Sequence, residues 1–315
     1  MQIVQAPRAS TILYSLLKRS DQANPWLLPA NICPIVPITF LKARVPFEFA
    51  DISAGTLHMD LEQAEALIRK RRFGGLLYAH TYGEASTPNE FFELIKKISP
   101  DLIVIDDRCL CNPDLEVDPA NKADVQLYST GYAKIVDLNS GGYAFMSDVV
   151  VYQPANLSFN PQHHEEIEKS YKQAVSRRTK YVYQDRDWLD TGSPVTSWPR
   201  YQQQIKINLA TSLAQRAELN KIYAGKLPDE IQLPGEYQTW RFNIRVKNKK
   251  QLLDRIFSSG LFASSHYASL AGIMGEGKAP QAEALAEDVI NLFNDHHFTV
   301  NQAEQVCKII LENLA

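Results

Sequence analysis

The sequence predicts an α/β protein with a large, doubly wound domain, in which helices cover a mainly parallel sheet, followed by a smaller α+β domain. Two observations lead to this fold class. In the first half of the chain, short apolar runs alternate with amphipathic stretches that carry helix start signals. In the second half, long charged helical stretches precede a mixture of strand-like and helix-like segments. We expect the large domain at residues 1–165, and the connecting helices with the smaller domain at residues 166–315.

The expected strands of the large sheet are six short apolar runs in the first half of the chain. Several are apolar nearly throughout, which is typical of parallel strands covered on both faces. The runs are residues 26–30, 45–50, 74–80, 101–107, 125–130 and 142–147.

Two helices between these strands have recognisable starts. Asp60, with Gln63 three residues later, predicts a helix that begins at residue 60. Thr87 and Glu90 flank Pro88, and this pattern predicts a helix with proline at its first position. The alternation of strand and helix therefore continues through this part of the chain.

The second half is predicted to contain longer helices and one strand. Thr299, with Gln302 after it, predicts the start of the helix that closes the chain. The other expected elements are helices at 161–185 and 202–225, separated by the segment 196–201, then a strand at 237–246 and a helix at 249–260 that ends at a glycine.

Composition and charge narrow the class of protein. The chain has 315 residues, 45% of them hydrophobic and 22% charged, which suits one large domain and one smaller domain. A net charge of −3 argues against nucleic acid as a partner. The N-terminus does not have the pattern of a signal peptide, and no apolar run approaches the roughly 20 residues of a membrane span. We expect a cytoplasmic protein with no membrane association.

The four cysteines do not form a recognisable metal-binding pattern. Cys109 and Cys111 make a C-x-C pair, but no second pair completes a zinc site, and Cys33 and Cys307 lie far away in the sequence. We therefore expect reduced thiols and no metal.

Polar segments follow several of the predicted strands. In doubly wound sheets, ligands bind outside the carboxyl ends of the strands. The segments at these ends are residues 80–83, Asp106 with Asp107, and residues 129–134. We expect them to line one crevice.

Asp107 and Lys134 suggest the chemistry of this crevice. Asp107 ends the most apolar strand, where an ionised carboxylate is costly to bury unless a cation meets it. Lys134 lies in the loop after the next strand. The pair suits a pyridoxal phosphate (PLP) site, in which the lysine forms a Schiff base and the acid keeps the pyridine nitrogen protonated. The alternatives are that the lysine is a solvated surface charge and that either aspartate belongs to an Asx turn.

A phosphate would need backbone N–H groups and hydroxyls. Ala9, Ser10 and Thr11 stand where an apolar helix is expected to begin, which is an anion site by geometry and dipole. Ser129 offers another hydroxyl. The alternative for Ser10 or Thr11 is a simple helix cap.

Eight segments in order resemble one family over essentially the whole chain. "RASTIL", "LLPANICP…FEFADI", "LLYAHTYGEAS", "LIVIDD" and "LYSTGYAKIVDLNSGGYAF" are followed by "WRFNIRV", "SSHYASL" and "VINLFNDHHFT". These segments resemble the DegT-like sugar aminotransferases, which are fold type I PLP-dependent enzymes. The resemblance implies a three-layer α/β/α large domain and a smaller C-terminal domain.

The resemblance also implies roles for individual residues. Lys134 matches the Schiff-base lysine and general base, and Asp107 matches the partner of the pyridinium nitrogen. Ser10, Thr11, the backbone of Ala9, and Ser129 match the phosphate-binding positions. Cys33 falls where the family has an aromatic residue over the cofactor ring, and His266 with Tyr267 matches a segment near bound substrate. The alternative for His266 and Tyr267, which is equally compatible with the sequence, is that they form a half-buried pair in a connecting segment without contacting substrate.

The family reaction would move an amino group, usually from glutamate, to a keto sugar attached to a nucleotide. The resemblance further implies a homodimer with sites at the subunit interface, and a place in polysaccharide or antibiotic sugar biosynthesis by analogy.

Three departures from the family keep other functions open. Leu110 stands where the family has a glutamine, Arg108 replaces a small residue beside Asp107, and Cys33 replaces the aromatic residue. The chain is also short for the family. The alternatives are a binding or regulatory protein that has lost the transfer chemistry, and an enzyme of the same fold running a different PLP reaction such as dehydration. Lys134 argues against dehydration, because the dehydrating members have histidine there. A nicotinamide-dependent enzyme is disfavoured, since no G-x-G-x-x-G follows the first strand.

Overall fold

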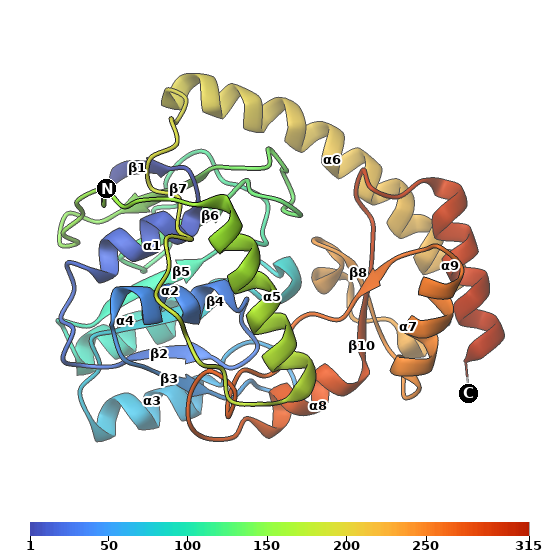
Figure 1. Ribbon diagram of the computed structural model, residues 1–315, viewed down its shortest axis with the longest axis horizontal. Helices are drawn as coiled ribbons and strands as arrows, with labels where there is room; N and C mark the ends of the chain where they lie inside the picture. Colours follow the sequence, from blue (N-terminus) through green and yellow to red (C-terminus); the bar gives the residue numbers. More distant parts are fainter. Residues whose placement is uncertain (315) are drawn as a thin grey trace.

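The computed structural model describes residues 1–314 and contains a large and a small unit joined by long helices (Figure 1). The large unit is built on a sheet of seven strands, within the described residues, in the order β1-β7-β6-β5-β4-β2-β3. The pairs from β3 to β6 are parallel, and β7 is antiparallel to both β6 and β1. The strands are β1 (Gln2–Ala6), β2 (Trp26–Pro29), β3 (Phe47–Ala50), β4 (Gly75–Ala79), β5 (Ile103–Asp107), β6 (Val125–Ser129) and β7 (Gly142–Met146).

The six strands expected in the first half of the chain are confirmed. β1 is the strand that the sequence analysis missed. Its sequence, QIVQA, is short and has a glutamine on either side of Ile3 and Val4, and it forms a strand because it pairs with β7 at the edge of the sheet. Edge strands need only one bonded neighbour, so their local sequence signal is weak.

Helices cover both faces of this sheet. Leu76 and Val104 pack on one face with residues of α3 and α4, whereas Leu77 and Ile105 pack on the other face with residues of α1 and α2. Successive residues of a strand point to opposite faces, so burial on both faces produces the continuous apolar runs seen in the sequence. The helices are α1 (Ala9–Leu17), α2 (Ile35–Ala43), α3 (Leu61–Lys70) and α4 (Asn89–Ile98).

One predicted helix start is confirmed and the other is shifted. The Asp60 side chain caps α3 by accepting a hydrogen bond from the Gln63 N–H at 3.0 Å. Helix α4 begins at Asn89, so Pro88 occupies the cap position and not the first helical position. Thr87 makes no cap, because its hydroxyl accepts a hydrogen bond from the Arg108 guanidinium at 2.8 Å.

The long helices of the second half differ in extent from the prediction. Helix α5 (Pro161–Arg177) is shorter than expected, because the left-handed residue Arg178 ends it. Helix α6 (Trp198–Lys226) is longer, since Pro199 is compatible with the first turn and does not separate two elements. Ile167 and Ala174 of α5 belong to the same apolar core as residues of α1 and α2. The division expected between residues 165 and 166 stays a prediction.

The small unit is the α+β unit that the sequence predicts. Its antiparallel sheet has the order β8-β10-β9 and packs against α7, α9 and the C-terminal part of α6. Figure 1 shows α6 extending from the large unit to the small one, and α5 along the side of the large unit that is nearer to the small unit. The elements of the second half are β8 (Phe242–Arg245), α7 (Lys249–Ser258), β9 (Ala263–Ser264), α8 (Pro280–Asp288), β10 (Val289–Leu292) and α9 (Val300–Asn313), with short 3₁₀ turns at Asp229–Ile231 and Gly235–Gln238. A further 3₁₀ turn, Thr81–Gly83, follows β4 in the large unit.

The closing helix α9 begins as expected, with a capping box between Thr299 and Gln302. Among the helices of residues 1–314, none combines the length and apolar character that crossing a membrane requires.

Candidate active site

A cavity of about 230 Å³ lies at the carboxyl ends of β5 and β6. Its volume is below the usual range for sites that hold drug-sized ligands, roughly 300–1,000 Å³. Helix α5 contributes to its wall. The residues that the sequence analysis placed at a site and that line this cavity are Ala9, Ser10, Cys33, Asp107, Ser129 and Lys134.

Three predicted site residues do not line this cavity. The Thr11 hydroxyl is buried and donates to the backbone carbonyl of Asp190 at 2.6 Å, so it faces a neighbouring loop. His266 and Tyr267 lie between β9 and α8. There Tyr267 stacks on Trp240, with the two rings nearly parallel and their centroids 6.1 Å apart.

Asp107 is the buried carboxylate of the cavity. Its Oδ1 atom accepts a hydrogen bond from the backbone N–H of Cys109 at 3.0 Å. The Cys109 thiol also forms a hydrogen bond with the Asp107 carboxylate, and no cationic side chain of residues 1–314 forms an ion pair with it. Asp107 therefore retains an oxygen that can accept a hydrogen bond from a ligand.

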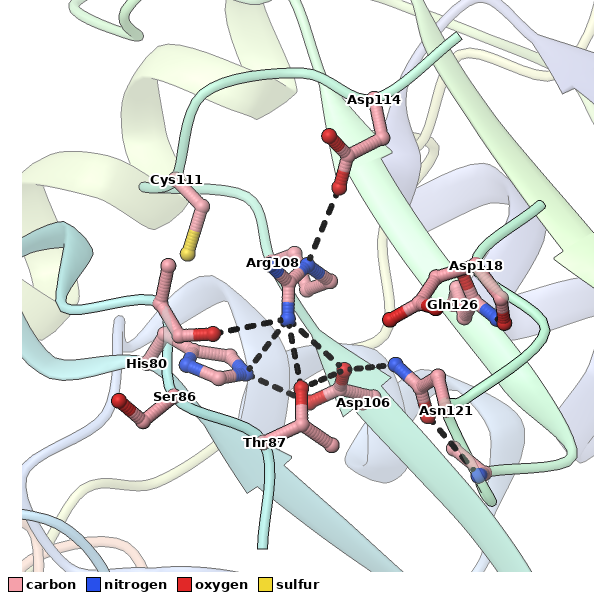
Figure 2. A network of polar contacts seen from close by, with 12 residues as sticks. His80, Ser86, Thr87, Asp106, Arg108, Cys111, Asp114, Asp118, Asn121 and Gln126 are labelled. Atoms are coloured by element: carbon pink, nitrogen blue, oxygen red, sulfur yellow. Dashed lines mark hydrogen bonds and ion pairs between the residues drawn. The ribbon is translucent and has the colours of Figure 1, made fainter. Parts of the chain in front are cut away.

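Asp106 points to the other side of the sheet, into a network of polar side chains (Figure 2). Its carboxylate accepts hydrogen bonds from His80 and Asn121, both at 2.6 Å, and lies 3.3 Å from the Arg108 guanidinium. Burial alone would raise the pKa of Asp106. His80, Arg108 and Asn121 outweigh burial and hold this pKa below its usual value.

The same network shows where Arg108 points. Its guanidinium contacts Asp106 and Thr87, and it approaches Asp114 at 3.7 Å (Figure 2). It makes no contact with Asp107. The arginine beside the candidate cofactor aspartate therefore does not compete for that aspartate.

His80 uses both of its ring nitrogens for hydrogen bonds within this network. Its Nδ1 lies 2.7 Å from the carbonyl oxygen of Glu84, and its Nε2 lies 2.6 Å from Asp106. Both ring nitrogens of His80 therefore have hydrogen-bond partners. His58, His80 and Glu84 place possible metal-ligating atoms within 4.8 Å of one another. The two ring nitrogens of His80 are already engaged by the Glu84 carbonyl and Asp106 in this arrangement.

The N-terminus of α1 forms another wall of the cavity. The first N–H groups of a helix have no acceptor within the helix, so those of Ala9 and Ser10 are suited to an anion. Gly142 lies directly beneath them, and a Cβ atom at this position would overlap the backbone of Arg8 and Ala9. Glycine is therefore required here for the helix to approach the end of β7.

Lys134 lies in the loop between β6 and β7, and its side chain lines the cavity. Among residues 1–314, no carboxylate or other acceptor binds its Nζ atom. At the start of the same loop, the Ser129 hydroxyl accepts a hydrogen bond from the Gly131 N–H at 3.2 Å. The loop thus presents an amine and a hydroxyl to the same cavity.

Two thiols also line the cavity. Burial raises the pKa of Cys33, and it raises the pKa of Cys109 well above its usual value, so both remain neutral at physiological pH. Leu110 points elsewhere and joins an apolar cluster that includes Tyr82.

Several lining residues were not found from the sequence. Arg8 lies beside the α1 terminus, and His164, Glu168 and Tyr171 come from α5. The sequence predicted α5 only as a charged helix. Its residue pattern shows that a helix forms, but not which part of the large unit the helix packs against. Only the path of the chain between β7 and α5 brings them to the cavity.

No protein-family model and no curated protein matches this chain. Solved structures match it over nearly its whole length, and the sugar aminotransferases among them share its fold. The expected fold is therefore confirmed.

Three of these structures illustrate the likeness. Spr1654 from Streptococcus pneumoniae, described as a sugar aminotransferase and solved in its PMP form, has 15% sequence identity and a TM-score of 0.71, with coverage of 98% of this chain and 86% of that chain. The sugar aminotransferase CalS13 from Micromonospora echinospora has 14% identity and a TM-score of 0.70, with coverage of 99% and 87%. A DegT DnrJ EryC1 StrS aminotransferase from Brucella abortus has 14% identity and a TM-score of 0.67, with coverage of 99% and 86%.

Proposed function

We propose that this chain is a PLP-dependent aminotransferase that transfers an amino group, from glutamate, to a keto sugar or a nucleotide-linked keto sugar. The observation that carries the proposal is the convergence of three features on one cavity. These features are the free amine of Lys134, the buried carboxylate of Asp107, and the N-terminus of α1. The fold and the sugar aminotransferases among its structural neighbours support the same class of reaction.

The residues of the cavity fit the cofactor. Asp107 retains one carboxylate oxygen for a protonated ring nitrogen, and Lys134 has an unpaired amine. The helix N–H groups of Ala9 and Ser10, with the Ser129 hydroxyl, are suited to a phosphate. Gly142 keeps the space that the approach of α1 needs. The neutral thiols of Cys33 and Cys109 are apolar enough to pack against a ring.

PLP bound at this position would supply an aldehyde that takes up the amino group and a ring that withdraws electrons. The protein would supply position and proton transfer. Lys134 would hold the cofactor and then carry a proton to and from the amino-bearing carbon. Asp107 would hold the proton of the ring nitrogen, because a buried carboxylate favours a cationic partner.

The finer parts of the proposal concern substrates and assembly. The amino donor is glutamate, the acceptor is a keto sugar, and the enzyme works as a cytoplasmic homodimer whose second subunit completes the site. We also propose that His266 and Tyr267 contact the substrate. They are linked to the Lys134 loop through Trp240, whose indole donates to the carbonyl of Ala133 at 2.7 Å.

An absorbance scan tests the cofactor assignment. Purified protein with added PLP should develop a visible absorbance band that borohydride removes, and peptide mapping should then find the cofactor on Lys134. The Lys134→Ala variant is the control and should show neither change. Labelling of a different lysine, or no labelling of folded protein, would contradict the proposal.

A second candidate is a protein that binds PLP but does not transfer an amino group to a sugar. The small volume of the cavity and the contribution of α5 to its wall favour this candidate. Incubation of the loaded protein with glutamate separates the two. Formation of 2-oxoglutarate supports the aminotransferase, whereas cofactor on Lys134 without 2-oxoglutarate supports the second candidate.

A further inference from the structure

Three consecutive backbone carbonyls around Lys134 are each held by a side chain from the C-terminal half of the chain. Trp240 Nε1 donates to the carbonyl of Ala133 at 2.7 Å, and Arg216 Nη2 donates to the carbonyl of Lys134 at 3.2 Å. Ser212 Oγ donates to the carbonyl of Ile135 at 2.5 Å. We call Ser212, Arg216 and Trp240 the carbonyl clamp.

The clamp holds a segment that would otherwise be unfavourable. Ala133 has a φ of 60°, in the left-handed region that residues other than glycine rarely adopt. Its N–H donates to Asp137 Oδ2 at 2.8 Å, and its carbonyl accepts from Trp240. Such strained residues persist only where the surroundings restrain them, and they are concentrated at functional sites.

The three residues of the clamp are also bonded to one another. Arg216 Nε donates to Ser212 Oγ at 3.1 Å, and Arg216 Nη1 donates to the carbonyl of Trp240 at 2.5 Å. A side chain that is already fixed loses little conformational freedom when it bonds the loop. The clamp therefore acts as a rigid unit.

Buried polar side chains of the small unit hold the carbonyl clamp in place. Arg216 is 3% exposed, donates to Asn294 Oδ1 at 2.5 Å, and lies 4.0 Å from Asp295. Asp295 also forms a buried ion pair with Arg241. Burial and the nearby Arg241 lower the pKa of Arg216 to about 10, so its guanidinium remains charged at neutral pH. The Lys134 loop is thus attached to a buried polar cluster of the small unit.

We infer that Ser212, Arg216 and Trp240 are positioning residues that set the place of the Lys134 amine by holding the backbone on both sides of it. The inference rests on the proposed function, because Lys134 is taken as the lysine that binds the cofactor. The physical reason is that a reacting group displaced by about 1 Å reacts about a hundredfold more slowly. A lysine side chain has several free rotations, so its amine keeps a defined position only when its backbone does.

Trp240→Phe is the most selective test of the clamp. It removes the donor to Ala133 while keeping an aromatic ring against Tyr267. Ser212→Ala removes the donor to Ile135. Trp198→Phe is the matched control, since Trp198 packs against Tyr143 and no hydrogen bond of its indole is present within residues 1–314. Arg216 is a poorer target, because its removal also breaks the hydrogen bond to Asn294 and takes a charge away from the neighbourhood of Asp295.

Three readouts follow the loop and its lysine in full-length protein. Hydrogen exchange of the peptide covering residues 130–141 is measured without cofactor. The rate at which acetic anhydride acylates Lys134 is measured across pH, and the rate at which borohydride fixes PLP to Lys134 is measured in loaded protein. We expect exchange of the loop to rise about tenfold in Trp240→Phe, with exchange elsewhere unchanged. Fixation of PLP to Lys134 should slow about tenfold, and Ser212→Ala should change both in the same direction.

The outcomes separate this inference from the proposed function. Equal loop exchange and equal Lys134 reactivity in folded Trp240→Phe and Trp198→Phe would overturn the inference. So would a lower melting temperature without a local change at the loop. If the unmodified protein does not bind PLP at Lys134, the proposed function fails. Loop exchange and acylation then still decide whether the clamp holds the loop.

Discussion

Asp106 and Asp107 are neighbours on β5, yet they occupy two regions with opposite properties. Asp106 is fully buried and is surrounded by donors from His80, Asn121 and Arg108. Asp107 has one backbone donor and faces the cavity. A carboxylate whose oxygens are all engaged stabilises the fold but has no capacity left for a ligand. The pleat of one strand thus separates a structural region from a candidate functional one.

Replacement of Asp107 should have the largest effect on activity. In Asp107→Asn the carboxylate charge that the ring nitrogen needs is lost, so we expect amino transfer to slow about a thousandfold, equivalent to about 4 kcal/mol of barrier. The free energy of unfolding should change by less than about 1 kcal/mol. Steady-state kinetics and urea denaturation check both expectations. An Asp107→Asn enzyme with normal turnover would remove Asp107 from the site.

Replacement of Asp106 should have the converse effect. Asp106→Asn removes the charged partner of the buried Arg108 guanidinium and an acceptor of His80, so the free energy of unfolding should fall by about 3 kcal/mol. Urea denaturation measures this loss. PLP should still label Lys134 in the folded fraction. Unchanged stability with lost labelling would reverse the assignment of the two aspartates.

Arg108→Met should have an intermediate effect and should act on stability alone. Arg108 donates to Thr87 and pairs with Asp106, and each of these two contacts contributes about 1 kcal/mol. We expect a loss of about 2 kcal/mol in the free energy of unfolding and no change in turnover. A change in turnover at constant stability would contradict this expectation and would mean that the Arg108 side chain affects the candidate active site.

Ser129→Ala and Thr11→Val compare two hydroxyls that the sequence assigned to the phosphate. Ser129 lines the cavity, so its loss should weaken PLP binding about tenfold, equivalent to about 1.4 kcal/mol. Thr11 donates to the Asp190 carbonyl, so its loss should leave PLP binding unchanged and cost about 1 kcal/mol of stability. Titration of each variant with PLP measures the first effect. Equal weakening in both variants would show that Thr11 also faces the phosphate.

The last expected effect is the pH dependence of stability that comes from His58. Burial, followed by repulsion from His80, lowers the pKa of His58 to about 4 in the folded protein, against about 6.5 in an unfolded chain. Between these values the unfolded state binds more protons. Stability should therefore be complete above about pH 6.5 and should decline as the pH falls toward 4.

Denaturation of the unmodified protein and of His58→Gln at pH 7 and pH 5.5 measures this decline. The variant should lose less stability over this interval. An equal loss in both proteins would assign the decline to other groups, with the nearby Glu84 the first to examine.

The sequence by itself determined the class of fold and most of the candidate site. Strands buried on both faces need continuous apolar runs, and the ends of parallel strands meet at one edge of the sheet. These two facts lead from the residue pattern to Asp107, Ser129 and Lys134 at a common cavity. The expectation that Asp106 and residues 80–83 line the same crevice was wrong, and for Asp106 the reason is that successive residues of a strand point to opposite faces of the sheet.

The tertiary structure decided the contacts that depend on the path of the chain. Periodicity shows that two neighbouring side chains on a strand point to opposite faces of the sheet, but it does not show which face carries a cavity. The Thr11 hydroxyl faces Asp190, α5 adds Glu168 to the cavity, and Arg216 reaches the Lys134 carbonyl. Each of these contacts joins residues far apart in the sequence. Their partners are set by how loops and helices pack, and no local pattern of residue types records that packing.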